Sequence, residues 1–182
     1  MKTAYVIAAN GSEEIETIAP LDFLRRAGAD ARLIGLDTKE PVLSHGVTVV
    51  CDGVLDEVCG TLPDLLVLPG GLKGAANISA SDTLREMAAR QLKENRLLGA
   101  ICATPAHALA KWGLTAGRSW TCYPGCEAAG ESVRQERVVV DGNLITARGP
   151  GVSLEFAAAL VRALCGTDAA EQLVSGTLTL IR

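Results

Sequence analysis

Short apolar runs alternate with amphipathic segments along most of the chain, and the runs are typical of buried strands. They have few polar interruptions, as expected of strands that are covered on both faces in a parallel sheet. These runs occupy residues 3–8, 31–36, 65–68 and 97–101. Residues 138–140 and 144–147 form a further pair, and the Asp141-Gly142-Asn143 turn between them predicts an antiparallel hairpin.

The segments between the runs show helical periodicity or residues that begin and end helices. A first helix is predicted over residues 14–27, and Gly28 ends it. Its apolar face is predicted to consist of Ile15, Ile18, Leu21 and Leu24. Further helices are predicted over residues 82–95 after a Ser81-Asp82 cap, over 105–112, over 153–164, and after a capping box formed by Asp168 and Glu171.

Two less regular stretches complete the pattern. Residues 41–43 and 47–52 are predicted to form a small hairpin at the edge of the sheet, and residues 119–121 a brief strand. Alternation of strands and helices predicts an α/β fold, a three-layer sandwich with a mostly parallel sheet. With 182 residues, we expect one domain over 1–182.

Composition excludes several classes of partner. The net charge is -4 and the sequence has no basic cluster beyond Arg25-Arg26, so we expect no nucleic acid and no membrane as partner, but a small ligand. No apolar run reaches the ~20 residues of a membrane helix, and residues 5–9 are too short for a signal-peptide core. We therefore expect a cytoplasmic protein whose six cysteines are reduced.

Cys102 stands where a buried strand passes into a helix. Thr104 is placed to cap that helix, and Pro105 is tolerated in its first turn. The thiol then lies beside unpaired backbone N–H groups and the positive end of a helix dipole, which favour the thiolate. The arrangement resembles a nucleophile elbow without its Gly-x-Ser-x-Gly frame. The alternative is an inert, buried cysteine.

The loops after parallel strands converge at the carboxyl edge of a sheet, and three such loops carry candidate chemistry. They supply Glu13, Glu14 and Glu16 after the first strand, Gly70 and Gly71 after the strand of residues 65–68, and Cys102 after the strand of residues 97–101. A buried Glu16 would be protonated and would share one proton with the thiol, whereas an exposed Glu16 would be an ordinary residue of a first helical turn. The N–H groups of Gly71 and Ala103 are candidates to stabilise an oxyanion or an oxidised sulfur.

Neither histidine is well placed to act as a base. His107 follows Cys102 by five positions, about 140° around the helix, so it should not face the thiol. His45 reaches the site only by a long fold-back or from another subunit, and each histidine has a plain surface or packing role as its alternative. Cys122 and Cys126 lack a second pair or a nearby histidine, so no metal site is predicted.

Four motifs, in order, carry a resemblance to a known family: GSEEIETIAPLDFLRRAG, VLPGG, GAICATPA and LITARGPG. The sequence resembles the ThiJ/PfpI superfamily, specifically its DJ-one (parkinsonism-associated deglycase) branch, over essentially its whole length. This resemblance implies a flavodoxin-like fold of the class I glutamine amidotransferase-like type, a homodimer and no cofactor. It also implies roles for individual residues: Cys102 as nucleophile, Glu16 as its protonated partner, Gly71 and Ala103 as backbone donors, and Arg148 and Pro150 in shaping the pocket with Gly70 and Tyr123.

The resemblance also implies a function in defence against reactive carbonyls and oxidative stress. One hypothesis is a weak glyoxalase or deglycase that acts on methylglyoxal or on glycated thiols and amines. Another is a redox-sensing chaperone that is switched by oxidation of Cys102 to the sulfinate. Relatives with clear glyoxalase activity carry histidine where this sequence has Tyr123, and this departure favours the second hypothesis modestly. A third, a peptidase or amidotransferase-like hydrolase, needs a Cys-His pair that the sequence does not supply.

Overall fold

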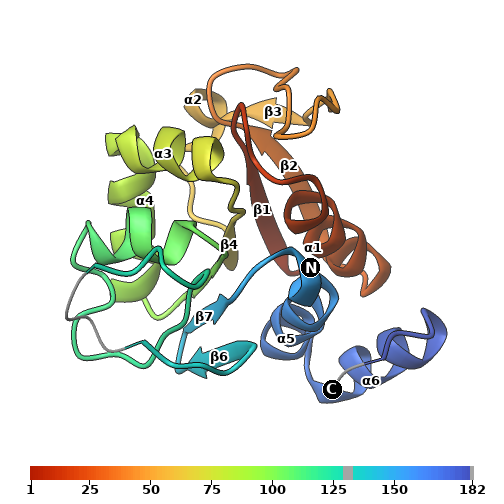
Figure 1. Ribbon diagram of the computed structural model, residues 1–182. Helices are drawn as coiled ribbons and strands as arrows, with labels where there is room; N and C mark the ends of the chain where they lie inside the picture. The colour runs from red at the N-terminus through yellow and green to blue at the C-terminus, as the bar shows by residue number, and fades with distance from the viewer. Residues whose placement is uncertain (129–132, 181–182) are drawn as a thin grey trace.

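The computed structural model describes residues 1–128 and 133–180, and a sheet of seven strands in this part of the chain forms its centre (Figure 1). The strands are β1 (Thr3–Ala8), β2 (Asp30–Gly35), β3 (Gly53–Val54), β4 (Leu65–Leu68), β5 (Leu97–Ile101), β6 (Val138–Asp141) and β7 (Leu144–Ala147). Their order across the sheet is β3-β2-β1-β4-β5-β7-β6. All neighbours pair in parallel except β6 and β7, which form the predicted antiparallel hairpin.

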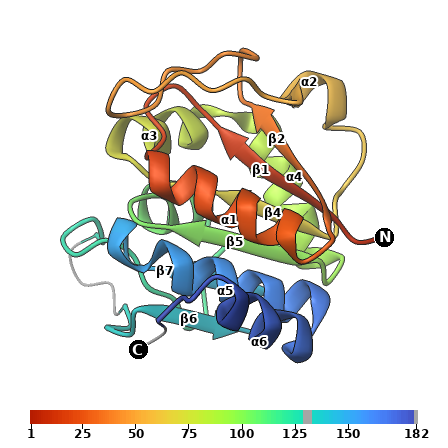
Figure 2. The ribbon, with the colours of Figure 1, turned by 90° about the vertical axis from the view of Figure 1, so that its right-hand side faces the viewer.

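Helices cover both faces of this sheet, as Figure 2 shows with α1 and α5 in front and α3 and α4 behind. The front layer contains α1 (Glu14–Arg26) and α5 (Ser153–Cys165), and α6 (Thr167–Gly176) packs beside α5. The other layer contains α2 (Leu55–Val58), α3 (Leu72–Ala80), α4 (Asp82–Lys93) and the π-helix η1 (Pro105–Ala110). A 3₁₀ turn, η2 (Pro150–Val152), leads into α5. The predicted three-layer α/β sandwich is confirmed, and no helix in the described residues is long and apolar enough to span a membrane.

Strand β4 shows why the sheet has two cores. All four of its side chains are fully buried, and alternate residues point to opposite faces. Leu65 and Val67 join the cluster under α1 and α5, whereas Leu66 and Leu68 join the cluster under α4 and η1. Each buried leucine contributes about 1.5–3 kcal/mol through the hydrophobic effect. This burial fixes the position of the C-terminal end of β4, and Gly70 and Gly71 follow shortly after it.

The predicted apolar face of α1 is wrong for its first turns. Leu21 and Leu24 are buried as expected, but Ile15 is 53% and Ile18 is 41% exposed. Glu16 is buried instead, because the first turn of α1 lies at the carboxyl edge of the sheet rather than over its apolar face. The polar contacts at that edge override the amphipathic pattern.

The stretch from residue 41 to 52 contains the predicted small hairpin, centred on the turn of residues 41–49, but this hairpin does not form the edge of the sheet. A single antiparallel bridge joins Val42 to Thr48, and the edge strand is β3. The turn folds onto the loop after β1, where Gly11 N donates to Val42 O at 2.8 Å and Ser44 N to Ser12 O at 2.9 Å. The backbone groups of this stretch are therefore satisfied partly within it, as where Leu43 N donates to Val47 O at 2.8 Å, and partly by that loop.

Residues 119–121 form no strand, contrary to the prediction. The N–H of Thr121 donates to the side-chain oxygen of Thr146 in β7 at 3.0 Å, so the backbone ladder of the sheet does not extend to this segment. The segment lies beside β7 through a side-chain contact alone.

Two predicted helix caps are also wrong, whereas Ser81 caps α4 as expected. The Thr104 hydroxyl donates to Pro69 O at 2.6 Å and does not cap η1. Asp168 lies inside the first turn of α6, because that helix begins directly after Gly166, whose φ of +99° ends α5. The short helices α2 and α3 were not predicted, since α3 carries a glycine in its interior and α2 has a single turn.

Candidate active site

Cys102 occupies a sharp turn between β5 and η1. Its φ is +64°, in the left-handed region that non-glycine residues rarely adopt, at a cost of about 1–2 kcal/mol. Two backbone hydrogen bonds hold it there: Cys102 N donates to Ala147 O at 2.9 Å, and Tyr123 N donates to Cys102 O at 2.8 Å. The side chain is 8% exposed. Strain of this kind is found where a side chain must be presented in one fixed direction.

Glu16 is brought to Cys102 by the first turn of α1. The carboxylate of Glu13 caps this turn by accepting from Glu16 N at 2.8 Å. Glu16 itself is fully buried, its Oε2 accepts from Gly70 N at 2.9 Å, and its carboxyl hydrogen-bonds the thiol of Cys102. The interpretation of Glu16 as an exposed residue of a first helical turn is therefore wrong.

Burial raises the pKa of the Glu16 carboxyl to about 7, because the charged form loses its hydration. The nearby charge of Glu13 also raises this pKa, whereas the hydrogen bonds from Cys102 and from Gly70 N–H lower it. A carboxyl group that titrates near neutrality is able both to donate and to accept a proton at physiological pH.

The thiol of Cys102 has a pKa raised to about 12, first by burial and then by the charge of Glu16. Hydrogen bonds from the backbone N–H groups of Gly71 and Ala103 act in the opposite direction. The net direction contradicts the prediction that this position favours the thiolate, because burial and a neighbouring carboxylate outweigh the backbone donors. Between the pKa of Glu16, about 7, and that of Cys102, about 12, the pair therefore holds one proton.

Gly70 and Gly71 fit this site because neither position has room for a side chain. A Cβ on Gly70 would lie 2.5 Å from both the Cβ of Cys102 and Oε2 of Glu16. Gly71 has a φ of +81°, and a Cβ there would contact the carbonyl oxygen of Gly11. The backbone at the end of β4 thereby approaches both members of the pair.

The other predicted pocket residues lie around this pair at different distances from it. Tyr123 is tied to Cys102 through its backbone, is 48% exposed, and has its ring against Gly149. Arg148 is half-buried and donates from Nη1 to Gln135 O at 2.9 Å. Pro150 is half-buried and begins η2. The structure thus brings together five of the predicted site residues: Cys102, Glu16, Gly70, Gly71 and Ala103. The side chain of Arg148 instead donates to the backbone of Gln135.

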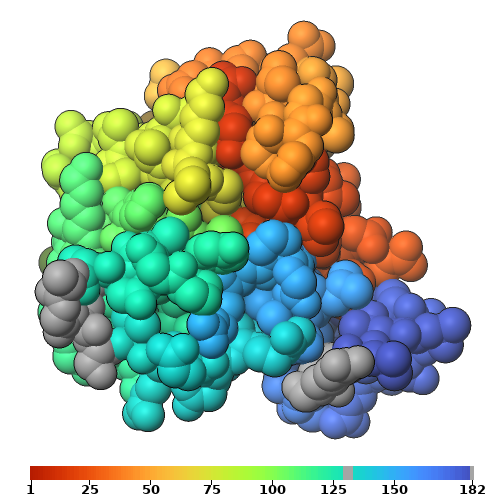
Figure 3. Space-filling view, viewed as in Figure 1, coloured from red at the N-terminus to blue at the C-terminus, as the bar shows by residue number. Residues whose placement is uncertain are grey.

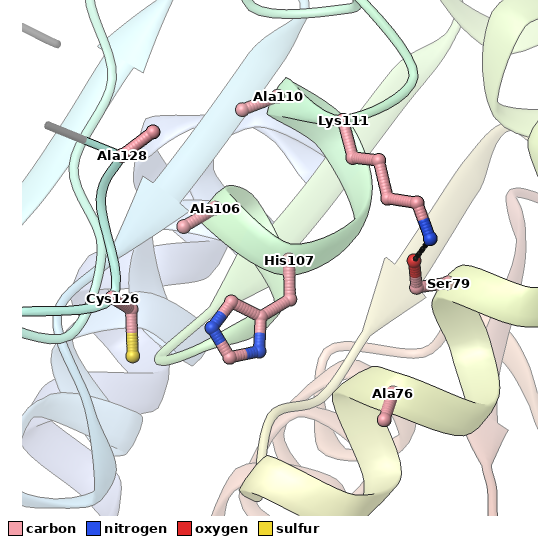
Figure 4. Close-up of a pocket in the computed structure, with 8 residues that line it drawn as sticks. All are labelled: Ala76, Ser79, Ala106, His107, Ala110, Lys111, Cys126 and Ala128. Carbon is pink, nitrogen blue, oxygen red and sulfur yellow. Dashed lines mark hydrogen bonds between the residues drawn. The ribbon is translucent and has the colours of Figure 1, made fainter.

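The two histidines form no hydrogen bond with Cys102 in the described residues. His107 points into a cavity of about 630 Å³ that it shares with Cys126, while Lys111 donates to Ser79 at the cavity wall (Figure 4). His45 lies on the turn of residues 41–49 and contacts Glu14, with 2.8 Å between Nδ1 and Oε2. Sequence reasoning missed this contact, since nothing local predicts that the turn folds onto α1.

Comparison with known proteins places this architecture in a family. The sequence matches the DJ-1/PfpI family over residues 2–163. The chain belongs to the DJ-1/PfpI family. Its sequence is 41% identical over 179 residues to the Parkinson disease protein 7 homolog of Danio rerio, covering 94% of each chain. Its fold superposes on Toxoplasma gondii DJ-1, oxidized, with a TM-score of 0.94, 31% identity and full coverage of both chains.

Two further DJ-1/PfpI relatives define how far the match extends. Protein DJ-1 homolog B of Arabidopsis thaliana is 43% identical over 173 residues, which are 93% of this chain and 40% of that protein. The chain therefore spans less than half of this plant relative. Glutathione-independent glyoxalase DJR-1.2 of Caenorhabditis elegans is 31% identical over 166 residues, 90% of this chain and 88% of that protein.

Proposed function

We propose that this protein detoxifies reactive carbonyls without a cofactor, with Cys102 as nucleophile and Glu16 as proton donor and acceptor. The observation that carries this proposal is the buried Cys102–Glu16 pair, in which the carboxyl group titrates with a pKa of about 7 beside the N–H groups of Gly71 and Ala103. The relative named a glutathione-independent glyoxalase supports an activity on methylglyoxal. Glycated thiols and amines are the other substrate class that we propose.

The chemistry balances without an external oxidant. The proton of the pair moves to Glu16, and the sulfur of Cys102 attacks the aldehyde carbon of methylglyoxal, giving a hemithioacetal whose oxyanion the backbone N–H groups stabilise. Glu16 protonates that oxygen, removes the proton from the former aldehyde carbon and returns it to the neighbouring carbon, while the hydroxyl proton on the former aldehyde carbon passes to the oxygen of the neighbouring carbon. The product is a lactoyl thioester, which water hydrolyses to lactate and the free thiol.

Turnover of methylglyoxal to lactate tests this proposal. We expect weak activity in the wild-type protein that needs no glutathione, is unchanged by a metal chelator and is lost in Cys102→Ser. Cys122→Ser is the matched control, because Cys122 is also buried but is not part of the Cys102–Glu16 pair. Turnover that survives Cys102→Ser would contradict the covalent mechanism.

A redox-sensing chaperone is the second candidate function. The similar Toxoplasma gondii structure is described as oxidized, and Tyr123 stands where a glyoxalase is expected to carry histidine. In this function Cys102 is oxidised by peroxide to the sulfinate, and Glu16 donates a hydrogen bond to the product. Clean formation of the sulfinate without any turnover of methylglyoxal would favour this candidate over the enzyme.

The proposal includes a homodimer in the cytoplasm. Ile15 and Ile18 are exposed on α1, as is Leu154 at the start of α5, and burial of these side chains against a second copy would remove apolar surface from water. The six cysteines, all of them in the described residues, form no disulfide bond, which is the state that a reducing compartment maintains. Analytical ultracentrifugation of the wild type and of Ile18→Glu tests the dimer.

A further inference from the structure

The turn of residues 41–49 brings a histidine onto the first turn of α1. His45 N donates to Glu14 Oε1 at 2.6 Å, its Nδ1 lies 2.8 Å from Glu14 Oε2, and Ser44 donates to the same oxygen at 2.8 Å. Three contacts therefore fix the carboxylate of Glu14 against the imidazole. Figure 3 shows this face of the molecule, where the turn (orange) meets the loop after β1 (red) and the start of α3 (yellow).

Glu13 adds a second carboxylate to this place. It is 8% exposed, its Oε2 accepts from Glu16 N, and its Oε1 accepts no hydrogen bond from the described residues. Glu13 and His45 line a cavity of about 830 Å³, which Gly71 and Lys73 also line. One ligand atom from each of Glu13, Glu14 and His45 lies within 4.8 Å of the other two. The Glu13 carboxylate lies at this cavity with one oxygen that accepts no hydrogen bond from the described residues, so that oxygen is available as a ligand for a cation.

We propose that Glu13, Glu14 and His45 bind one divalent transition-metal ion of the zinc class. Imidazole nitrogen and carboxylate oxygen bind Zn²⁺ at about 2.0–2.2 Å, so ligand atoms around one ion lie up to ~4.4 Å apart. The observed spacing needs only small side-chain movements to reach that range. The ion would take the place of the proton between His45 and Glu14. A single imidazole among the ligands favours Zn²⁺, Co²⁺ or Ni²⁺ over Mg²⁺ and Ca²⁺.

The ligands of this site include neither Cys102 nor Glu16, although Glu13 also caps the turn that carries Glu16, and the proposal does not rest on the proposed function. Its three ligands come from the cap of α1 and from the turn of residues 41–49. With three protein ligands, one coordination position would stay open to water, and the cavity that Glu13 and His45 line lies beside the cluster.

Titration of the full chain with Co²⁺, followed by visible absorption and by calorimetry, tests the site. We expect one ion per chain with a spectrum of nitrogen and oxygen ligands, and displacement by Zn²⁺. His45→Ala and Glu14→Gln should each weaken binding at least tenfold, because even loss of an outer partner of a metal ligand costs about 10- to 100-fold. His107→Ala and Glu40→Gln are matched controls and should bind Co²⁺ like the wild type, since neither side chain belongs to the cluster.

Two results would overturn the proposal. One is a charge-transfer band from thiolate to cobalt, which would place the ion on cysteine rather than on the cluster. The other is affinity that His45→Ala and Glu14→Gln leave unchanged. His45→Ala alters an exposed side chain, so its thermal unfolding should resemble that of the wild type, whereas Glu14→Gln weakens the three contacts of that carboxylate and should unfold at a somewhat lower temperature. Neither result bears on lactate formation by Cys102, so the two proposals can fail separately.

Discussion

The buried carboxyl of Glu16 hydrogen-bonds the thiol of Cys102, and its charge raises the pKa of that thiol. The two residues are 86 positions apart in the sequence, and Gly70 fills the narrow space beside both. This relationship determines the protonation state of the site, and the first predictions follow from it.

Replacement of Glu16 should lower the pKa of the Cys102 thiol from its value of about 12. Glu16→Leu removes the negative charge, and Glu16→Gln removes the charge and adds an amide donor to the thiolate, so the pKa should fall in the order wild type, Leu, Gln. Ultraviolet absorbance of the thiolate against pH measures this order, with Cys102→Ser subtracted for the other five thiols. Equal titrations in all three proteins would show that Glu16 does not act on the sulfur.

Stability should fall as the pH rises through the pKa of Glu16. The folded state raises this pKa from 4.5 to about 7, so the folded protein holds the proton more tightly than the unfolded chain does. The resulting stabilisation is complete below pH ~4.5 and is lost as the pH rises through about 7, with an upper magnitude on the order of 3 kcal/mol. Urea unfolding at about pH 5 and about pH 8 measures it. Glu16→Gln should remove this slope, whereas Glu40→Gln, at an exposed position, should retain it.

Gly70→Ala should disturb the pair directly. Its Cβ would lie 2.5 Å from both Cys102 and Glu16, and overpacking of this kind costs about 1–3 kcal/mol of the free energy of unfolding. Gly60→Ala is the matched control, since a Cβ there meets nothing within 4 Å, and its effect should stay within about 0.5 kcal/mol. Denaturant unfolding and the thiol titration together measure the change. A Gly70→Ala protein with wild-type stability and wild-type thiol pKa would show that the backbone shifts freely at this position.

Tyr123→His should raise the turnover of methylglyoxal. Phenols are poor bases at neutral pH, and a positioned acid-base group contributes about 10²- to 10⁴-fold. The backbone of Tyr123 is held on Cys102 O at 2.8 Å, so a histidine there starts from a fixed position beside the site. Tyr123→Phe keeps the ring on Gly149 and should leave the rate unchanged. A rate for Tyr123→His no higher than that of Tyr123→Phe would mean that the pocket does not orient the imidazole.

The sequence predicted the strands well because their signal is local. Strands β1, β4 and β5 and the hairpin of β6 and β7 are short apolar runs between turn residues, and the structure has them within a residue or two of the predicted bounds. Burial on both faces requires apolar residues at every position, and that requirement is visible in the sequence itself. The convergence of loops at the carboxyl edge of the sheet also followed from the fold class alone.

Tertiary structure decided what depends on contacts between distant segments. The sequence by itself determined the α/β fold and the place of Cys102 at the end of β5, since both follow from apolar periodicity. It did not determine that Glu16 is buried while Ile15 and Ile18 are exposed, because the edge of the sheet, and not the helix pattern, sets which side of α1 is covered. Nor did it determine the contact of His45 with Glu14 or the raised pKa of Cys102. Burial and charge depend on distances in space, and those distances exist only once the chain has folded.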